Sequence, residues 1–499
     1  MTEDSIRLRY SGFILFLFRL ISVGTGLLNT LIITRNVSIE EYGIFNNIND
    51  VLSYFTLVAM VIPFWVTRFV ARRHPGSSKT GLVVNTIIAT TAATLYIFMI
   101  PGILHALQIC GEYLATYMVG VFLIIENHIV AVLEAILRSR RPETIGFGLF
   151  VFEVSKVPLV FLFIVILGMK LMGALIGLTL AFLIQIVFYL RYLMPLFKGK
   201  IRWDYVKEWF KASLLNIYNI VGGRILMLTN IFLFSVSELS RAYYGASQAI
   251  SSIIGYSFYL AFALYPKLLS GGGEEDVTTS LKMVLMFAIP MTLGAITLSG
   301  DILSILNVSY RVAKPVLMAL SLNAFLTTLS LVFGSIISGT EKIDVSAKIS
   351  CKEIIKSKLF LSITLIYVQA AIVVPSTYLI FTSVSLDALT AAVYLASINV
   401  PANVIVMLAK YMIARKCLKF TIPWMNIGKY FIASLPMVLA LYLLQTPVRL
   451  TVTVAKVLFG ALIYFLILSM IDEETKRIIR FVKKEAAKTF LGRAEQGKL

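Results

Sequence analysis

Six ionisable side chains lie near the middle of stretches that are otherwise apolar enough to span a lipid bilayer: Arg19, Glu126, His128, Glu153, Lys156 and Arg224. A charged Arg, Lys or Asp at the centre of a membrane-spanning helix costs roughly 2.5–3.5 kcal/mol by insertion measurements, so such a group must face a bundle interior or a watery cavity. All six belong to the first half of the chain or to the first apolar stretch of the second half. This distribution predicts a transport path lined mainly by the first half.

Polar residues also repeat along single faces of other predicted helices. Asn46, Asn49 and Asp50 are spaced i, i+3 and i+4, which places them on one helix face. Asn219 and Gln248 belong to similar stripes on the first two apolar stretches of the second half. Hydrogen bonding between helices is the alternative role for these residues, and it is common in membrane bundles.

Arg19 and Arg224 differ from the amides because neither has an acidic residue one turn away in its own helix. We therefore expect both arginines to line a cavity. The predicted substrate-binding set joins these cations to the polar stripes and comprises Arg19, Arg224, Asn46, Asn49, Asp50, Asn219 and Gln248.

The other ionisable groups are candidates for coupling transport to an ion gradient. Glu153 and Lys156 are spaced i, i+3 and can neutralise each other, so a structural pair is as good an interpretation as a functional one. His128 can titrate near neutral pH and relay protons, although a hydrogen-bonded structural histidine is the favoured interpretation. Glu126 lies about 200° around the helix from His128, and we expect Glu126 to be the coupling residue.

Catalytic motifs are missing from the sequence. There is no GxSxG, HExxH or Walker A pattern and no soluble domain that could hold a nucleotide, so the chain is predicted not to be an enzyme and to need no cofactor. It has three Cys and three His without a CxxC or a His/Cys cluster, and no metal site is predicted.

Composition indicates a membrane protein made of helices. The chain is 59% hydrophobic and only 14% charged, whereas soluble domains are about 25% charged. A membrane-spanning helix needs about 20 apolar residues. Windows of that length predict about fourteen spans, at roughly 10–34, 43–68, 82–104, 113–137, 145–167, 171–193, 212–237, 242–265, 280–299, 313–338, 359–382, 386–411, 428–446 and 449–471.

The distribution of the basic residues behind the net charge of +19 is explained by membrane topology. If the N-terminus is cytoplasmic and the spans alternate, most of the 45 Lys and Arg fall in inner loops, as the positive-inside rule requires. We therefore expect both termini to be cytoplasmic in a prokaryotic plasma membrane. Nucleic acid is not an expected partner.

A faint internal repeat divides the chain. Tyr42-Gly43 follows the first predicted span and Tyr244-Gly245 follows the seventh, so the two copies have the same orientation, as in parallel repeats. The predicted fold is all-α, with two parallel six-helix lobes related by a pseudo-two-fold axis and two extra C-terminal helices. The predicted parts are an N-terminal lobe at 1–193, a cytoplasmic amphipathic linker at 194–211, a C-terminal lobe at 212–411, two further spans at 412–471 and a basic tail at 472–499 that contacts anionic lipids.

The sequence from Ser38 to Phe45, which reads Ser-Ile-Glu-Glu-Tyr-Gly-Ile-Phe, follows a first span that ends in an Ile-Thr-Arg run. Together with the span count, this resembles polysaccharide-biosynthesis transporters of the Wzx type, within the multidrug/oligosaccharidyl-lipid/polysaccharide exporter superfamily. The resemblance implies two lobes that meet in a V around a cationic cavity, with Arg19 and Arg224 at the positions of cavity cations. Glu126 and Glu153 are less typical of that family.

The function implied is a flippase that moves a lipid-linked oligosaccharide or polysaccharide precursor from the inner to the outer leaflet by alternating access. Its expected partners are a polyprenyl-linked glycan, anionic lipids and glycosyltransferases or a polymerase of the same pathway, and a monomer is expected. The alternative is an ion-coupled multidrug or cation antiporter of the same superfamily, in which Asp50, Glu126 and Glu153 would bind the ion.

Overall fold

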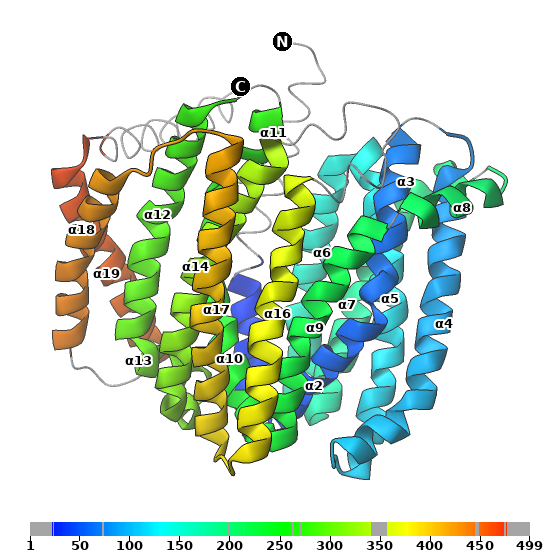
Figure 1. Cartoon of the computed structure of the whole chain (residues 1–499). Coiled ribbons are helices and arrows are strands. Elements are labelled where there is room, and N and C mark those ends of the chain that lie inside the picture. Colours follow the sequence, from blue (N-terminus) through cyan, green and yellow to red (C-terminus); the bar gives the residue numbers. More distant parts are fainter. Residues whose placement is uncertain are drawn as a thin grey trace, which may run out of the picture.

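The computed structural model describes residues 22, 24–71, 74–197, 199–212, 214–261, 264–269, 272–340, 357–444, 449–473 and 476. Regular structure in these residues is helical (Figure 1). The predicted cavity residue Arg19, the start of the first span and most of the basic tail lie outside the described residues.

Helices in the described part match the predicted membrane spans. Eleven of them are long and apolar enough to cross a membrane, or twelve if the pair on either side of a 53° bend after Phe55 is one span. Residues 24–36 are also helical, and they and α10 occupy the other two predicted spans. The helices are α2 (Ile39–Phe55), α3 (Val61–Ala71), α4 (Ser77–Ala106), α5 (Leu114–Arg140), α6 (Pro142–Phe161), α7 (Lys170–Leu193), α8 (Trp203–Ala212), α9 (Leu214–Val236), α10 (Glu238–Gly255), α11 (Leu264–Leu269), α12 (Glu274–Thr297), α13 (Ser299–Leu306), α14 (Lys314–Thr340), α16 (Lys358–Ser383), α17 (Ala388–Cys417), α18 (Trp424–Leu443) and α19 (Leu450–Ile471).

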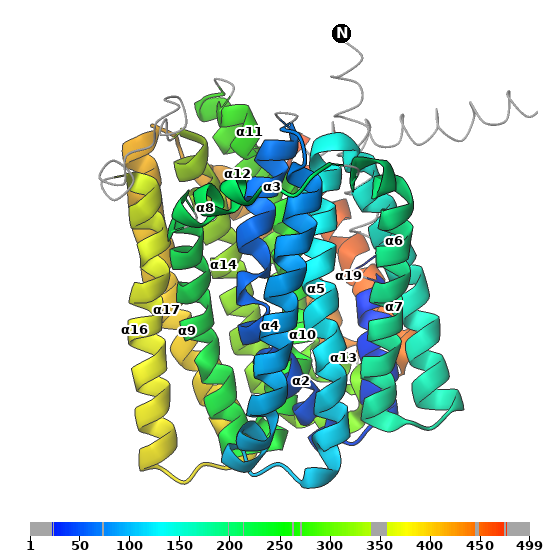
Figure 2. The ribbon, with the colours of Figure 1, turned by 90° about the vertical axis from the view of Figure 1, so that its right-hand side faces the viewer.

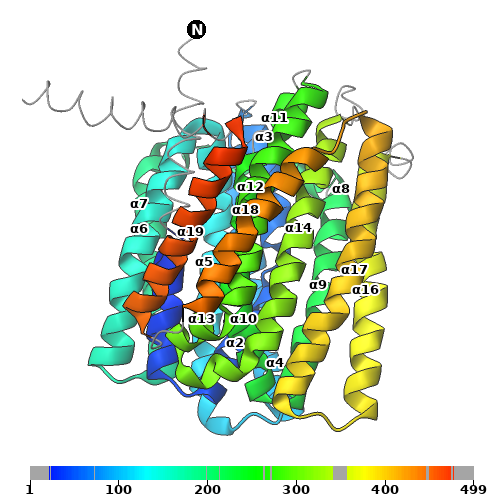
Figure 3. The same cartoon turned by 90° about the vertical axis from the view of Figure 1, so that its left-hand side faces the viewer.

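The spans pack in two groups and a C-terminal pair. Helices α2 to α7 form the first group, with α4 against α5 and α6 against α7 (Figure 2). Helices α9, α10, α12, α14, α16 and α17 form the second group, in which α14 packs extensively on α17. Helices α18 and α19 pack on each other and on α12 at the periphery (Figure 3). The described chain is therefore an all-α, multi-pass membrane protein.

Basic residues mark one end of the bundle, here called the basic end. Helices α5, α7 and α17 finish there with Arg138, Arg191 and Arg415 in their last turns. The end at which α2 begins and α4 finishes is called the opposite end. That this end faces the cytoplasm, as the positive-inside rule would have it, stays a prediction.

The linker between the groups forms the predicted amphipathic helix, α8, but its aromatic side packs on the protein. Trp209 is fully buried, with its ring 5.5 Å from the ring of Phe69 in α3 and perpendicular to it. The amide of Arg202 donates to Thr80 Oγ1 at 2.9 Å. Trp203, in contrast, is exposed. The linker helix therefore covers the ends of α3 and α4, and only part of its apolar surface is available to lipid.

The two helices that carry the repeated Tyr-Gly sequence start with serine caps. Ser38 and Glu41 form a capping box at α2, in which the Ser38 hydroxyl accepts from the Glu41 amide. At α10, the Ser237 hydroxyl accepts from the Leu239 amide at 3.2 Å. These caps satisfy amides that the first helical turn leaves free. They fix where each helix begins and so which residues face the partner helix.

Helices α2 and α10 cross at the repeated glycines. A Cβ at Gly43 would overlap the backbone oxygen of Glu238, at the start of α10. A Cβ at Gly245 would lie 2.6 Å from Asn46 Nδ2, in α2. Small residues let two membrane helices approach to backbone contact. Each copy of the repeat therefore provides the space for the helix that carries the other copy.

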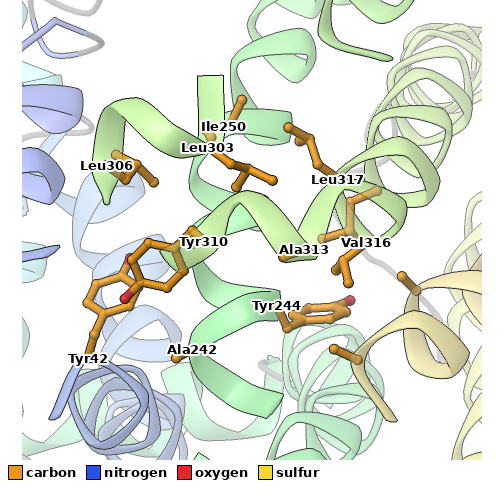
Figure 4. Packing of buried hydrophobic residues seen from close by; sticks show 14 of the residues in the cluster. Tyr42, Ala242, Tyr244, Ile250, Leu303, Leu306, Tyr310, Ala313, Val316 and Leu317 are labelled. Carbon is orange, nitrogen blue, oxygen red and sulfur yellow. The ribbon is translucent and has the colours of Figure 1, made fainter. Parts of the chain in front are cut away.

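Aromatic rings close the packing around this crossing. Tyr42 and Tyr310 are buried and meet edge to face, with centroids 6.0 Å apart. Tyr243 contacts the other side of Tyr310 at 6.4 Å. Figure 4 shows Tyr42 against Tyr310, and Tyr244 beside Val316 and Ala313. The apolar core therefore runs without interruption from the first group into the second.

Substitution of the crossing glycines should have graded effects on stability. We expect Gly43→Ala to lower the free energy of unfolding by about 1–3 kcal/mol, because its methyl group meets backbone that cannot rotate away. Gly245→Ala should cost less, since the Asn46 side chain can move. Gly255→Ala in α10 is the control, because its Cβ would have no neighbour within 4 Å. Thermal unfolding of the purified variants measures their relative stabilities. Equal stability of Gly43→Ala and Gly255→Ala would contradict the prediction.

Candidate functional site

An ion pair joins the two groups of helices close to the glycine crossing. Arg241 in α10 donates from Nε to Asp50 Oδ2 at 2.6 Å and from Nη2 to Asp50 Oδ1 at 3.0 Å. Asn230 in α9 lies 3.3 Å from the same Oδ1. Asp50 and Arg241 are 4% and 3% exposed, respectively. The predicted substrate-binding residue Asp50 is therefore occupied by a cation of the second group.

Arg241 was not among the predicted site residues. Its position before the predicted span 242–265 suggested an outer loop, whereas α10 begins at Glu238 and brings Arg241 into the bundle. Its Nη1 atom is buried and has no hydrogen-bond partner in the part of the chain that the structure describes. A buried ion pair is costly to break, because removal of one partner leaves an uncompensated charge. The pair therefore holds α2 and α10 together.

Arg224 lies at the same interface, beside Tyr54, which is one helical turn beyond Asp50 in α2. It is half-buried, and its carbonyl accepts a hydrogen bond from Tyr54 Oη, in α2, at 3.1 Å. Its Nη1 lies 3.0 Å from Met227 Sδ. Among the described residues, no carboxylate forms an ion pair with Arg224. Its guanidinium is thus a cation between the helix groups that a ligand can neutralise.

The predicted amide residues have different surroundings. Asn46 donates to the Tyr42 carbonyl at 2.7 Å and packs against Gly245. Asn49 is exposed and donates to the Phe45 carbonyl at 2.9 Å. Gln248 and Asn219 are also exposed. Asn46 thus has a packing role, and the three exposed amides remain candidates for contact with a ligand.

A cavity of about 250 Å³ lies between the helix groups at the basic end. Helices α3, α5 and α9 form its walls, and its lining residues are Pro63, Phe64, Thr67, Ala131, Glu134, Ala135, Arg138, Asn219 and Ile220. The Glu134 carboxylate accepts a hydrogen bond from Tyr189 at 3.0 Å. Glu134 and Arg138 are spaced i, i+4, a signal in the sequence that places both on one face of α5. The cavity brings Asn219 together with a cation and an anion that sequence reasoning did not assign to the site.

The opposite end of the same interface is closed. Arg35 donates from Nη2 to the Ile305 carbonyl at 2.7 Å and from Nε at 3.0 Å. Asn307 donates to the Thr34 carbonyl at 3.4 Å. These bonds join the first helix to the end of α13 and to the residue that follows it. The structure is therefore closed at the opposite end and hollowed at the basic end.

Glu153 and Lys156 form an ion pair within α6. Lys156 Nζ lies 2.5 Å from Glu153 Oε2, and both residues are buried. Thr25, in the first helix, donates to the same oxygen. This arrangement neutralises both charges and ties the first helix to α6.

Glu126 and His128, both in α5, have different surroundings. His128 is fully buried, and its Nδ1 lies 2.9 Å from the Ile124 carbonyl, so the imidazole is held within its own helix. Glu126 is 7% exposed, and its Oε2 has no hydrogen-bond partner in the described part of the chain. The structure therefore does not join the two residues directly.

Another ion pair across helices joins two elements of the second half of the chain. Lys456 in α19 is 7% exposed, and its Nζ donates to Asp301 Oδ2, in α13, at 2.7 Å. The two residues are far apart in the sequence, so no local pattern indicates the pairing. Within the described residues, no group of three or more His, Cys, Asp or Glu side chains is placed to hold a metal ion.

Solved structures with the same fold are membrane transporters of low sequence identity. The lipid II flippase MurJ in an inward closed conformation aligns with a TM-score of 0.65 at 15% identity, over 93% of this chain and 99% of that chain. An inward-facing multidrug resistance MATE family transporter of the MOP superfamily aligns with a TM-score of 0.61 at 15% identity. The alignment covers 79% of this chain and 95% of that chain. An outward-facing structure of such a transporter aligns with a TM-score of 0.55 at 14% identity. The alignment covers 83% of this chain and 96% of that chain.

No family model matches the sequence, and no curated protein matches it. At these identities the likeness to solved structures shows the fold alone. It extends over nearly the whole chain in the case of the flippase structure.

Removal of one partner of the Asp50–Arg241 pair should destabilise the protein. We expect Asp50→Ala and Arg241→Ala each to cost about 3–5 kcal/mol of unfolding free energy, whereas Asp50→Leu with Arg241→Met should recover most of that loss. Lys267→Ala is the control, since Lys267 is 62% exposed in its pair with Asp276 and an exposed pair contributes at most about 1 kcal/mol. Thermal unfolding measures all four variants, and a double variant less stable than both single ones would contradict the role of the pair.

Proposed function

We propose that this protein is a flippase that moves a lipid-linked oligosaccharide or polysaccharide precursor from the inner to the outer leaflet by alternating access. The observation that carries the proposal is Arg224, a half-buried cation without an ion-pair partner among the described residues, between two helix groups joined at the opposite end. The fold likeness to a lipid II flippase over 93% of the chain supports it.

The chemistry of such a substrate suits these residues. A polyprenyl pyrophosphate carries an anionic headgroup that cannot cross hydrocarbon unaided, and a guanidinium can bind its oxygens through two parallel hydrogen bonds. Arg224 and, by its predicted place in the first span, Arg19 would bind the pyrophosphate. Asn49, Asn219 and Gln248 would contact sugar hydroxyls. The cavity lined by Glu134 and Arg138 would receive the headgroup from the basic end.

Alternating access would then be a rocking of the two helix groups about this interface. The lobes at 1–193 and 212–411 would move relative to each other, and release outward requires the Asp50–Arg241 pair and the Arg35 bonds to open. The proposed setting is a prokaryotic plasma membrane with both termini cytoplasmic, and the proposed form is a monomer. The substrate would come from glycosyltransferases and pass to a polymerase of the same pathway.

An ion-coupled multidrug or cation antiporter is the second candidate. It is favoured by the buried carboxylate of Glu126, whose Oε2 has no hydrogen-bond partner in the described residues and could bind a proton or another cation. The fold is also that of MATE transporters. In this case a cationic compound would be exchanged for the ion bound at Glu126, and the charge of Arg224 would repel that compound.

Replacement of Arg224 should separate the two candidates. We expect Arg224→Ala to slow flipping of a fluorescent polyprenyl pyrophosphate oligosaccharide in proteoliposomes by about tenfold or more, because a hydrogen bond to a charged group is lost. Arg224→Lys should restore only part of the rate, since lysine lacks the planar fork. Arg191→Ala, at an exposed position in the last turn of α7, should flip at the wild-type rate.

The same vesicles can be tested for efflux of a cationic dye. Dye efflux driven by a cation gradient, without flipping of the oligosaccharide, would support the antiporter and contradict the flippase. Wild-type flipping by Arg224→Ala would contradict the assigned role of Arg224.

Glu126 is proposed to couple flipping to a proton gradient. We expect wild-type flipping to be faster with a pH gradient than without one, and Glu126→Gln to have the same rate in both conditions, since glutamine cannot exchange a proton. Glu112→Gln, at an exposed position before α5, is the control and should respond as the wild type does. A wild type that ignores the gradient, or a full response by Glu126→Gln, would leave Glu126 with a structural role only.

A further inference from the structure

An apolar groove lies between α16 and α17 at the basic end of the bundle, away from the interface described above. It has a volume of about 610 Å³ and is lined by Leu361, Leu365, Ala409, Tyr411, Met412 and Ile413. The two helices lie side by side (Figures 1 and 3). Leu361 and Met412 are 51% and 59% exposed, so the groove is open along its length. Exposed apolar side chains on a membrane-spanning helix are suited to contact with an acyl chain.

Cations surround the end of this groove. Arg415 and Lys416 are exposed and contribute to its lining. Arg415 Nη1 donates to Tyr411 Oη at 3.0 Å, and the guanidinium carbon lies 5.9 Å from the Tyr411 ring centroid. The tyrosine therefore holds the guanidinium over the groove. Lys358 Nζ, at the start of α16, donates to the Lys416 carbonyl at 3.1 Å and adds a third positive charge between the helix ends.

Arg415 and Lys416 have no acidic partner in the part of the chain that the structure describes. Within the described residues these two charges are therefore not neutralised, and they can attract an anion. A phosphate oxygen is a strong acceptor for a guanidinium, and basic pockets between membrane helices on the cytoplasmic side are suited to anionic headgroups. An apolar groove with a cationic end has the charge and polarity of a single anionic phospholipid.

We propose that this groove binds one anionic phospholipid of the surrounding bilayer. Its acyl chain lies along Leu361, Leu365 and Met412, and its phosphate contacts Arg415 and Lys416. The other side of α16 packs on α9, where the rings of Tyr218 and Tyr367 are stacked 4.4 Å apart. A lipid bound in the groove thus supports the helix that positions α9, which carries Arg224.

The test uses the full-length purified protein in detergent, titrated with phosphatidylglycerol or with phosphatidylcholine of the same chain length. Native mass spectrometry measures the retained lipid. We expect retention of one phosphatidylglycerol, in preference to phosphatidylcholine. Arg415→Ala with Lys416→Ala should bind it about 25-fold more weakly, since two cations near the lipid phosphate are lost. Leu361→Gln, which keeps the charges but places an amide in the acyl path, should also bind it several-fold more weakly.

Arg140→Ala with Arg191→Ala is the matched control, because it removes two exposed cations from the same end at other helices. It should retain phosphatidylglycerol as the wild type does. Equal loss in this control would show diffuse surface attraction and overturn the proposal. Equal retention of the two lipids by the wild type, or unchanged binding by Leu361→Gln, would overturn it as well. Displacement by a polyprenyl pyrophosphate at lower concentration than phosphatidylglycerol would assign the groove to the transported lipid instead.

Discussion

The crossing of α2 and α10 is the constraint on which the rest of this structure depends. Gly43 and Gly245 bring the two helices to backbone contact, and this places Asp50 within reach of Arg241. Once the crossing is fixed, the first helix reaches the end of α13, and Arg35 closes the opposite end. The hollow at the basic end then follows, because the two groups of helices are held together at the other end.

Charges within the bundle divide into paired and unpaired sets. Asp50 with Arg241, Glu153 with Lys156, and Asp301 with Lys456 neutralise one another. Such pairs avoid the large cost of an isolated charge in a low-dielectric interior, and they fix how neighbouring helices meet. Arg224 and Glu126 form no ion pair among the described residues. The proposed chemistry rests on these two residues.

The Asp50–Arg241 pair also links stability to motion. It must be stable enough to hold the opposite end closed, yet outward release in the proposed cycle requires it to open. A second ligand for either charge would lower the cost of that opening. The buried Arg241 Nη1, which has no hydrogen-bond partner in the described residues, leaves one donor free for such a ligand.

The sequence by itself determined the all-α, multi-pass class and the approximate positions of the eleven or twelve spans that the described residues contain. These follow from runs of about 20 apolar residues, which are a local property of the chain. The repeat of Tyr-Gly in Tyr42-Gly43 and Tyr244-Gly245 could also be seen, although its physical meaning could not. Spacing within one helix was also sufficient to suggest that Glu153 and Lys156 pair.

Only the tertiary structure decided which charges are paired across helices. Arg241 seemed to belong to a loop and Lys456 had no evident partner, because a hydropathy window contains no information about a partner in another helix. Asp50 looked like a ligand residue for the same reason, although it is occupied by Arg241. The two glycines show the difference most directly, since their lack of a side chain matters only when another helix lies against them. The roles of these residues depend on contacts between helices far apart in the sequence, and only the packing of the helices determines those contacts.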